Sequence, residues 1–182
     1  MKKKIFITGK PRVGKTTLVK KILSSLPGVR VEGFYTEEVR EGGRRVGFIL
    51  KTTSGESFPL ASLSGASPYR VGRYRVFLDG LDEVVRRMEE SRGEADLLVI
   101  DEVGKMECFS ETFVKFVRAL LESEETVLLG TVALKGSGLI EEVKGHPSVD
   151  LVTLTEENRE AVSGTLLPRL RRLLEGKGSI SS

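Results

Sequence analysis

The sequence predicts an α/β fold: a mostly parallel central sheet with flanking helices and an antiparallel insertion at about 36–77. Two observations lead to this fold class. Short apolar runs alternate with longer stretches whose apolar residues recur at helical spacing, which is typical of successive strand–helix units. Within the insertion this alternation stops, and short extended runs are separated by glycine-rich turns. We expect a single domain over 1–176, followed by a flexible tail at 177–182.

The first strand–helix unit contains a phosphate-binding motif. The apolar run Ile5–Ile7 precedes Gly9–Thr16, which matches G-x-x-x-x-G-K-[ST] at every fixed position. Leu18, Val19, Ile22 and Leu23 then fall on one face of an expected helix. A strand before the motif and a helix after it are the context of a P-loop. The residues predicted to contact a nucleotide are Gly9, Lys10, Pro11, Arg12, Val13, Gly14, Lys15, Thr16 and Thr17.

Each P-loop side chain suggests a role. Glycines at both ends let backbone N–H groups turn inward around phosphate oxygens, next to the positive end of the new helix. Lys15 has the length and charge to reach the β- and γ-phosphates, and the Thr16 hydroxyl suits a Mg²⁺ ligand. Lys10 and Arg12 either supply charge that a separate arginine finger would otherwise give, or form a solvated loop tip.

The next segments are assigned from their apolar patterns. Leu26-Pro27-Gly28 ends the first helix, and Val29–Tyr35 is expected to be a strand. Within the insertion, a hairpin turn and three extended runs are expected at 41–44, 45–50, 56–60 and 73–77. An apolar stripe then predicts a helix over 81–90.

Regular alternation returns in the second half of the chain. Strands are predicted at 97–100, 126–131 and 149–154, and helices at 110–121 and 139–144. Ser110 is the expected N-cap of the first of these helices. A last helix is expected to start with Thr155 as its cap and to kink or break at Pro168.

The apolar run Leu97–Ile100 ends in two acidic residues, Asp101 and Glu102. A buried strand of this type supplies the carboxylate on the magnesium side of P-loop proteins. We expect Asp101 to hold Mg²⁺ and Glu102 to orient and deprotonate the attacking water. Without a P-loop, the same pattern would equally fit a strand entering a solvated turn. Thr131 ends the neighbouring predicted strand, where it either touches the water or γ-phosphate, or is simply structural.

The amino-acid composition argues against several other kinds of partner and site. Positive and negative residues nearly cancel to a net charge of +3, and there is no long basic run that would indicate nucleic-acid binding. The single cysteine, Cys108, excludes an internal disulfide and a cysteine-based zinc site, and fits a cytoplasmic location. No apolar run approaches the roughly 20 residues of a membrane-spanning helix, so no membrane association is expected.

Five segments in order carry a resemblance to a known family over nearly the whole chain. They are Ile7–Thr17, Gly33–Arg40, Gly43–Phe48, Ile100–Glu107 and Glu157–Arg159. Together they resemble the nucleoside-triphosphatase family known from thermophiles, which includes the cancer-related nucleoside triphosphatase. The stretch Asp101–Glu107 is the most specific, because a P-loop alone identifies only a superfamily.

This resemblance implies a RecA-like P-loop fold and slow, Mg²⁺-dependent hydrolysis of ATP, GTP, CTP or UTP to the diphosphate and phosphate. It implies that the roles inferred above apply, with Lys15 and Glu102 catalytic and with Thr16 and Asp101 at the metal. Lys105 and Arg159 are accessory candidates by the same resemblance, which also includes Glu107 without a defined role. Arg159 either faces the base or ribose, or is a solvated arginine at a helix start.

Two other functions stay open. A kinase could use the insertion, with Arg40, Arg44, Arg45, Arg70, Arg73 and Arg75, as an acceptor site or lid. Against it, an acidic residue beside the magnesium carboxylate suits an enzyme that activates water, whereas a kinase must exclude water. A nucleotide-gated binding module with slow hydrolysis is the third possibility. The pattern does not indicate the physiological substrate, the oligomeric state or the source of an arginine finger.

Overall fold

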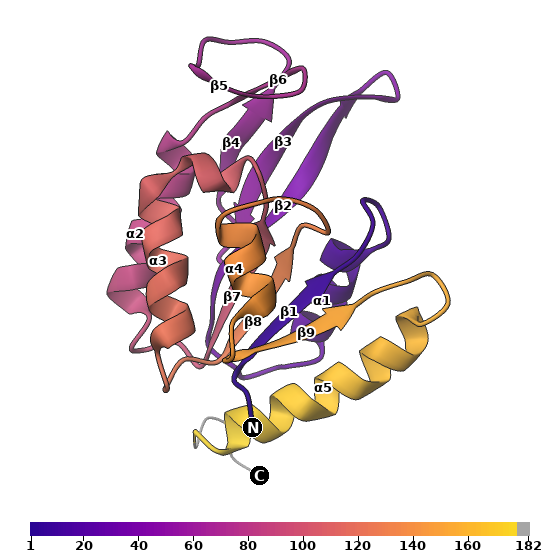
Figure 1. Cartoon of the computed structure of the whole chain (residues 1–182), viewed down its shortest axis with the longest axis vertical. Coiled ribbons are helices and arrows are strands. Elements are labelled where there is room, and N and C mark those ends of the chain that lie inside the picture. The colour runs from indigo at the N-terminus through magenta and orange to yellow at the C-terminus, as the bar shows by residue number, and fades with distance from the viewer. Residues whose placement is uncertain (178–182) are drawn as a thin grey trace.

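A mixed β-sheet runs through the length of the molecule and organises every other element (Figure 1). The computed structural model describes residues 1–177, and their strands lie in the order β5-β6-β4-β3-β2-β7-β8-β1-β9. Of the tail expected at 177–182, all but Lys177 lies outside the described residues. No helix within the described part is long and apolar enough to cross a membrane.

Five neighbouring strands form the parallel part of the sheet. They are β2 (Val31–Glu41), β7 (Leu97–Val103), β8 (Leu128–Val132), β1 (Lys4–Thr8) and β9 (Val149–Thr153). Because successive side chains alternate, Phe6 packs into one hydrophobic core while Ile5 and Ile7 pack into another. β8 lies between β1 and β7, so the strand before the P-loop and the strand bearing Asp101 end at one edge.

Helices cover both faces of the parallel strands. On one face lie α1 (Lys15–Ser24) and α5 (Arg159–Glu175); on the other lie α2 (Asp79–Ser91), α3 (Glu111–Glu122) and α4 (Leu139–Gly145). The capping expected for α3 is confirmed, since the Ser110 hydroxyl accepts a hydrogen bond from the Phe113 N–H at 3.0 Å. These layers confirm the predicted α/β fold with a mostly parallel central sheet.

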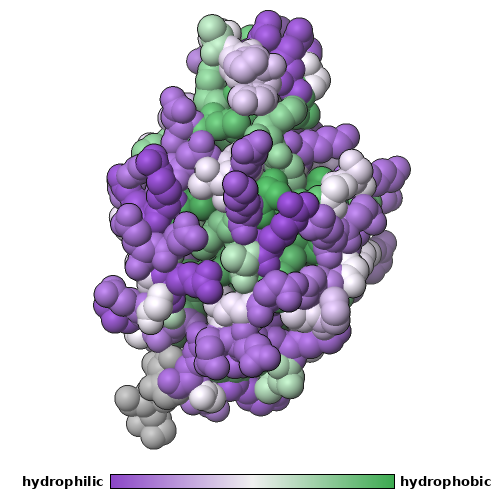
Figure 2. Space-filling model, turned by 60° about the vertical axis from the view of Figure 1, so that its left-hand side comes forward, coloured by the Kyte–Doolittle hydropathy of each residue, from purple (hydrophilic) through white to green (hydrophobic). Residues whose placement is uncertain are grey.

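The insertion is antiparallel, as predicted, and it extends the same sheet. It contains β3 (Arg44–Thr52), β4 (Ser57–Ser62), β5 (Tyr69–Val71) and β6 (Tyr74–Val76). β2 joins the two parts, because its first half pairs with β7 and its second half pairs with β3. In the space-filling view, hydrophobic residues gather in the upper and middle parts of the face shown (Figure 2).

The last helix differs from its prediction. Thr155 does not cap it: Thr155 and Asn158 instead exchange hydrogen bonds in a turn, and the helix begins at Arg159. The break considered at Pro168 is absent, because α5 continues through this residue. Leu166, Leu170, Leu173 and Leu174 are buried on either side of the proline, and this packing offsets the local cost of the missing N–H.

Candidate active site

The P-loop has the backbone geometry that its glycines suggested. Gly9 has φ +154°, and a Cβ there would lie 2.6 Å from the Leu154 carbonyl oxygen, so no side chain fits without displacement. Gly14, with φ +106°, precedes the first residue of α1. The first N–H groups of that helix therefore face the loop, as an anion site requires. Lys15 folds back over the loop and donates a hydrogen bond to the Gly9 carbonyl at 2.9 Å.

Asp101 is held at the edge of the sheet by hydroxyl groups from three elements. Its carboxylate accepts hydrogen bonds from Thr16 at 2.7 Å and from Thr131 at 2.5 Å, and its backbone carbonyl accepts one from Thr36 at 2.8 Å. The side chain is only 2% exposed. Burial raises the pKa of this carboxyl, and the hydrogen bonds and the positive charge of Lys15 oppose that shift.

These groups fit a magnesium ion. Mg²⁺ prefers oxygen ligands and keeps several waters, so it is bound by one or two protein oxygens together with substrate phosphates. The Thr16 hydroxyl and the Asp101 carboxylate supply such oxygens beside the P-loop. Among residues 1–177, no cluster of three or more acidic, histidine or cysteine side chains could hold a metal without a substrate.

Glu102 lies beside Lys15, with 3.6 Å between the Lys15 Nζ and a carboxylate oxygen. The peptide bond that joins Glu102 to Asp101 is cis. The Glu102 side chain is 32% exposed, so it borders the solvent-accessible space in front of the P-loop. Partial burial raises the pKa of Glu102, the negative charge of Asp101 adds to that rise, and Lys15 counteracts it. A carboxylate in this position can accept a proton from a nearby water.

A second acidic side chain, Glu107, lies behind Glu102. It belongs to the segment that carried the family resemblance, which left its role undefined. A Cβ on Gly104 would lie 2.8 Å from a Glu102 oxygen and 3.2 Å from a Glu107 oxygen, so only glycine leaves room for both carboxyl groups. Glu107 is 4% exposed, and burial together with the charge of Glu102 raises its pKa well above the usual value.

A cavity of about 890 Å³ joins the P-loop, the end of β7 and the insertion. All predicted P-loop residues line it except Val13. That side chain is 7% exposed and packs in the core with α1 and α5, so only its backbone can face a phosphate. Lys105 lines the cavity from the segment after β7. Arg159 lies on the P-loop itself, since a Cβ on Gly14 would be 3.9 Å from its Nε.

Thr131 is fully buried, and its contact is with Asp101. Thr36 and Lys135 are among the cavity residues that sequence reasoning missed. Thr36 is a polar residue at the point where β2 leaves β7, a signal that could have been used as it was for Thr131. Lys135 lies in the loop after β8, where no motif marked it.

Comparisons with known proteins find relatives that match most of this chain in sequence and in fold. The family model described as NTPase matches residues 4–167. The nucleoside-triphosphatase THEP1 of a Thermotoga species is 43% identical over 169 residues, which cover 92% of this chain and 95% of the relative. A crystal structure of THEP1 from Aquifex aeolicus has a TM-score of 0.84 at 38% identity, covering 92% of this chain and 98% of that one. The solution structure of a human cancer-related nucleoside triphosphatase has a TM-score of 0.76 at 40% identity, with 93% and 98% covered.

Proposed function

This chain belongs to the NTPase family, and on that premise we propose that it hydrolyses ATP, GTP, CTP and UTP to the nucleoside diphosphate and phosphate with Mg²⁺. The family resemblance expected from the sequence is thus confirmed. The names of the relatives support a nucleoside-triphosphatase, which is a hydrolase. The substrate range, the metal and the residue roles go beyond those names and are our inference, as is a cytoplasmic location.

One observation carries the proposal: the two acidic residues at the end of β7 meet the two functional residues of the P-loop. Thr16 contacts Asp101 at 2.7 Å, and Lys15 lies 3.6 Å from Glu102. Thr16 and Asp101 are 85 residues apart in the sequence, so the two pairs come together only in the fold. A chance match to either motif would not bring the side chains of both motifs into contact.

The residues divide the reaction between them. Thr16 and Asp101 would hold Mg²⁺, which when bound neutralises charge on the β- and γ-phosphate oxygens. The P-loop N–H groups and Lys15 bind the phosphates. Glu102 orients a water and takes its proton as the water oxygen forms a bond to the γ-phosphorus, while the bond to the β-phosphate oxygen breaks. Thr131 and Thr36 keep Asp101 in place, because buried polar groups need fixed partners.

Phosphate release tests this function. The protein with Mg²⁺ is given ATP, GTP, CTP and UTP in turn, with and without EDTA in excess over the metal. We expect release from all four at similar rates and none with EDTA. Release from no nucleotide, or unchanged release with EDTA, would contradict the proposal.

A second candidate, transfer of the γ-phosphoryl group to a small acceptor, rests on the extent of the cavity. Beyond the P-loop it continues over the insertion, where Arg45, Phe48 and Val71 line it. A kinase would consume triphosphate faster with its acceptor and would yield a phosphorylated product. Phosphate release in water alone, matched mole for mole by diphosphate, favours the hydrolase.

A further inference from the structure

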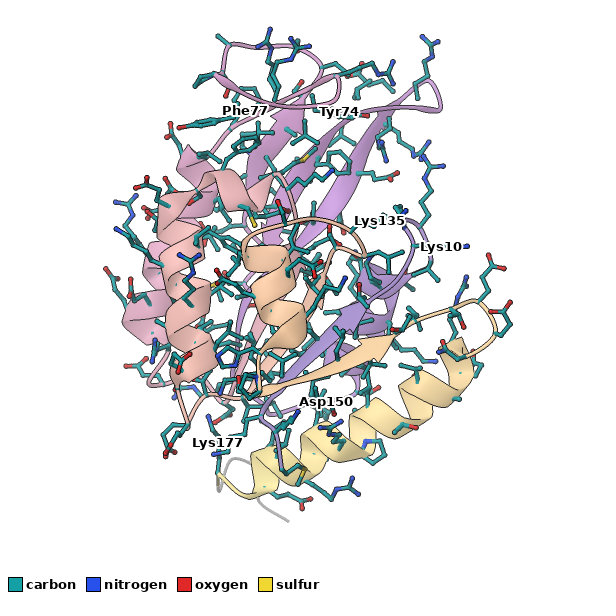
Figure 3. All side chains as sticks on the ribbon, viewed as in Figure 1. Lys10, Tyr74, Phe77, Lys135, Asp150 and Lys177 are labelled. Atoms are coloured by element: carbon teal, nitrogen blue, oxygen red, sulfur yellow. The ribbon has the colours of Figure 1, made fainter. Side chains whose placement is uncertain are left out.

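A lysine that no motif identified faces the same cavity as the P-loop. Lys135 lies in the loop between β8 and α4, and it lines the cavity together with Lys15 and Glu102. Figure 3 shows Lys135 near Lys10, at the edge of the sheet where the P-loop lies. β8 also carries Thr131, the residue that holds Asp101. Lys135 therefore follows by four residues the threonine of β8 that contacts the expected metal carboxylate.

The loop that carries Lys135 is anchored on both sides of it. The Ala133 N–H donates to the carbonyl of Val103 at 3.1 Å, which ties the start of the loop to the end of β7. The Lys144 ammonium donates to the Leu134 carbonyl at 2.6 Å. After Lys135, a Cβ on Gly136 would lie 2.3 Å from the Ile140 Cδ1, so the backbone rests against α4. Lys135 is exposed, but its backbone is fixed.

Lys15 and Lys135 approach the cavity from opposite sides of the sheet. Lys15 begins α1, which packs in the core shared with α5. Lys135 precedes α4, which packs in the core shared with α2 and α3. A phosphate bound at the P-loop edge would thus have one lysine from each face of the sheet.

The charges around the cavity leave Lys135 without a counter-charge of its own. Asp101, Glu102 and Glu107 all line the cavity, and Lys15 lies within ion-pair distance of Glu102. None of the ion pairs formed within residues 1–177 includes Lys135. A triphosphate beside these carboxyl groups needs positive charge close to its γ-phosphate, and Lys135 adds to the charge of Lys10, Arg12, Lys15 and Lys105, which line the same cavity.

We propose that Lys135 contacts the γ-phosphoryl group of the bound nucleoside triphosphate and stabilises the negative charge of the transition state, as an internal lysine finger. The inference rests on the proposed function and adds a catalytic residue to it. It makes an arginine supplied by another protein unnecessary for basal turnover. Arginine fingers contribute about 10³–10⁵ to turnover in GTPases. Because Lys135 is exposed, solvent screens its charge, so we expect a smaller contribution of about 10- to 100-fold.

The test compares Lys135→Ala and Lys135→Arg with Lys115→Ala. Lys115 is exposed on α3 away from the cavity, and its removal changes the net charge equally. We expect Lys135→Ala to lower kcat for ATP about 10- to 100-fold with less than about threefold change in KM. Lys135→Arg should keep most of the activity, and Lys115→Ala all of it. A kcat for Lys135→Ala within about twofold of wild type would overturn the proposal.

A binding measurement separates this inference from the proposed function. Calorimetry with Mg²⁺ and ADP, with and without aluminium fluoride, compares a ground state with a mimic of the transferring phosphoryl group. We expect Lys135→Ala to weaken the fluoride complex about 10-fold while ADP alone binds as in wild type. Equal affinities of both proteins for the fluoride complex would overturn the role of Lys135, even if the wild type hydrolyses all four nucleotides. If the wild type releases no phosphate, the hydrolase proposal fails, and the fluoride comparison still decides for or against Lys135.

Discussion

Replacing Thr131 with valine removes one hydroxyl from the shell around Asp101 and little else. The two side chains have nearly the same shape, valine brings no buried hydroxyl that lacks a partner, and Asp101 keeps its bond from Thr16, so the fold should tolerate the change. The lost interaction is the 2.5 Å hydrogen bond to the carboxylate. Thr16 and the Thr36 contact with the backbone remain, so Asp101 stays in place but is held on one side only.

The size of the effect follows from that contact. A hydrogen bond to a charged group contributes about 1.5–3 kcal/mol. Removing a partner that orients a metal ligand typically costs about 10- to 100-fold in metal affinity, which corresponds to about 1.4–2.7 kcal/mol. The two ranges overlap. We therefore expect Thr131→Val to need about 10- to 100-fold more Mg²⁺ for half-maximal phosphate release. At saturating Mg²⁺, turnover should recover to within about threefold of wild type.

The assay is phosphate release at saturating ATP across a Mg²⁺ titration, with nucleotide binding followed in parallel. Thr131→Ser keeps the hydroxyl and should restore most of the affinity for Mg²⁺. Thr153→Val is the matched control, because Thr153 is an exposed threonine on β9 of the same sheet. A wild-type Mg²⁺ dependence in Thr131→Val would refute the view that this hydroxyl orients a metal ligand. Loss of activity that no Mg²⁺ concentration restores would place Thr131 in the chemical step.

Two further predictions concern stability. The raised pKa of Glu107 means that the folded protein holds this proton more tightly than the unfolded chain, so without ligands the stability of wild type should fall as pH rises above about 4.5 toward the folded pKa. Glu107→Gln lacks this titrating group, so its Tm should vary less between about pH 4 and pH 8 than the Tm of wild type. An equal change of Tm with pH in the two proteins would exclude a tightly held proton on Glu107. A Cβ on Gly33 (φ +152°) would lie 2.0 Å from the Val99 oxygen, so Gly33→Ala should destabilise by more than about 3 kcal/mol. Gly164→Ala, in open space on α5, should stabilise by about 0.5–1 kcal/mol; equal Tm values for these two variants would contradict the packing described here.

Local patterns were sufficient for the elements whose own residues dictate them. The P-loop, the strand that ends in Asp101 and the apolar stripes of the helices each have a period or motif within a few residues. The parallel direction of the main strands also follows, since a helix between two strands brings the second strand back in the same direction as the first. By contrast, β5 has three residues and depends on pairing with β6 for its existence. The start of α5 was misplaced because Thr155 and Asn158 prefer each other in a turn.

The site was less accessible to sequence reasoning where it depends on contacts between distant segments. Motif positions identified Lys15, Thr16 and Asp101 because each of them belongs to a short local motif. That Val13 faces the core is decided by packing against α5, which no pattern around the P-loop reveals. Lys135 reaches the cavity through a loop whose course depends on contacts with Val103 and Lys144. Residues of this kind become visible only once the strands are placed side by side.

The most direct test of the account separates nucleotide binding from hydrolysis in Glu102→Gln. This variant keeps the size of the side chain and removes the proton acceptor, while Lys15 and the P-loop remain. We expect Glu102→Gln to bind ATP within about threefold of wild type and to release phosphate at least about 100-fold more slowly, whereas Lys15→Ala should lose the binding itself. Phosphate release from Glu102→Gln at the wild-type rate would contradict the account, because water would then be activated by some other group.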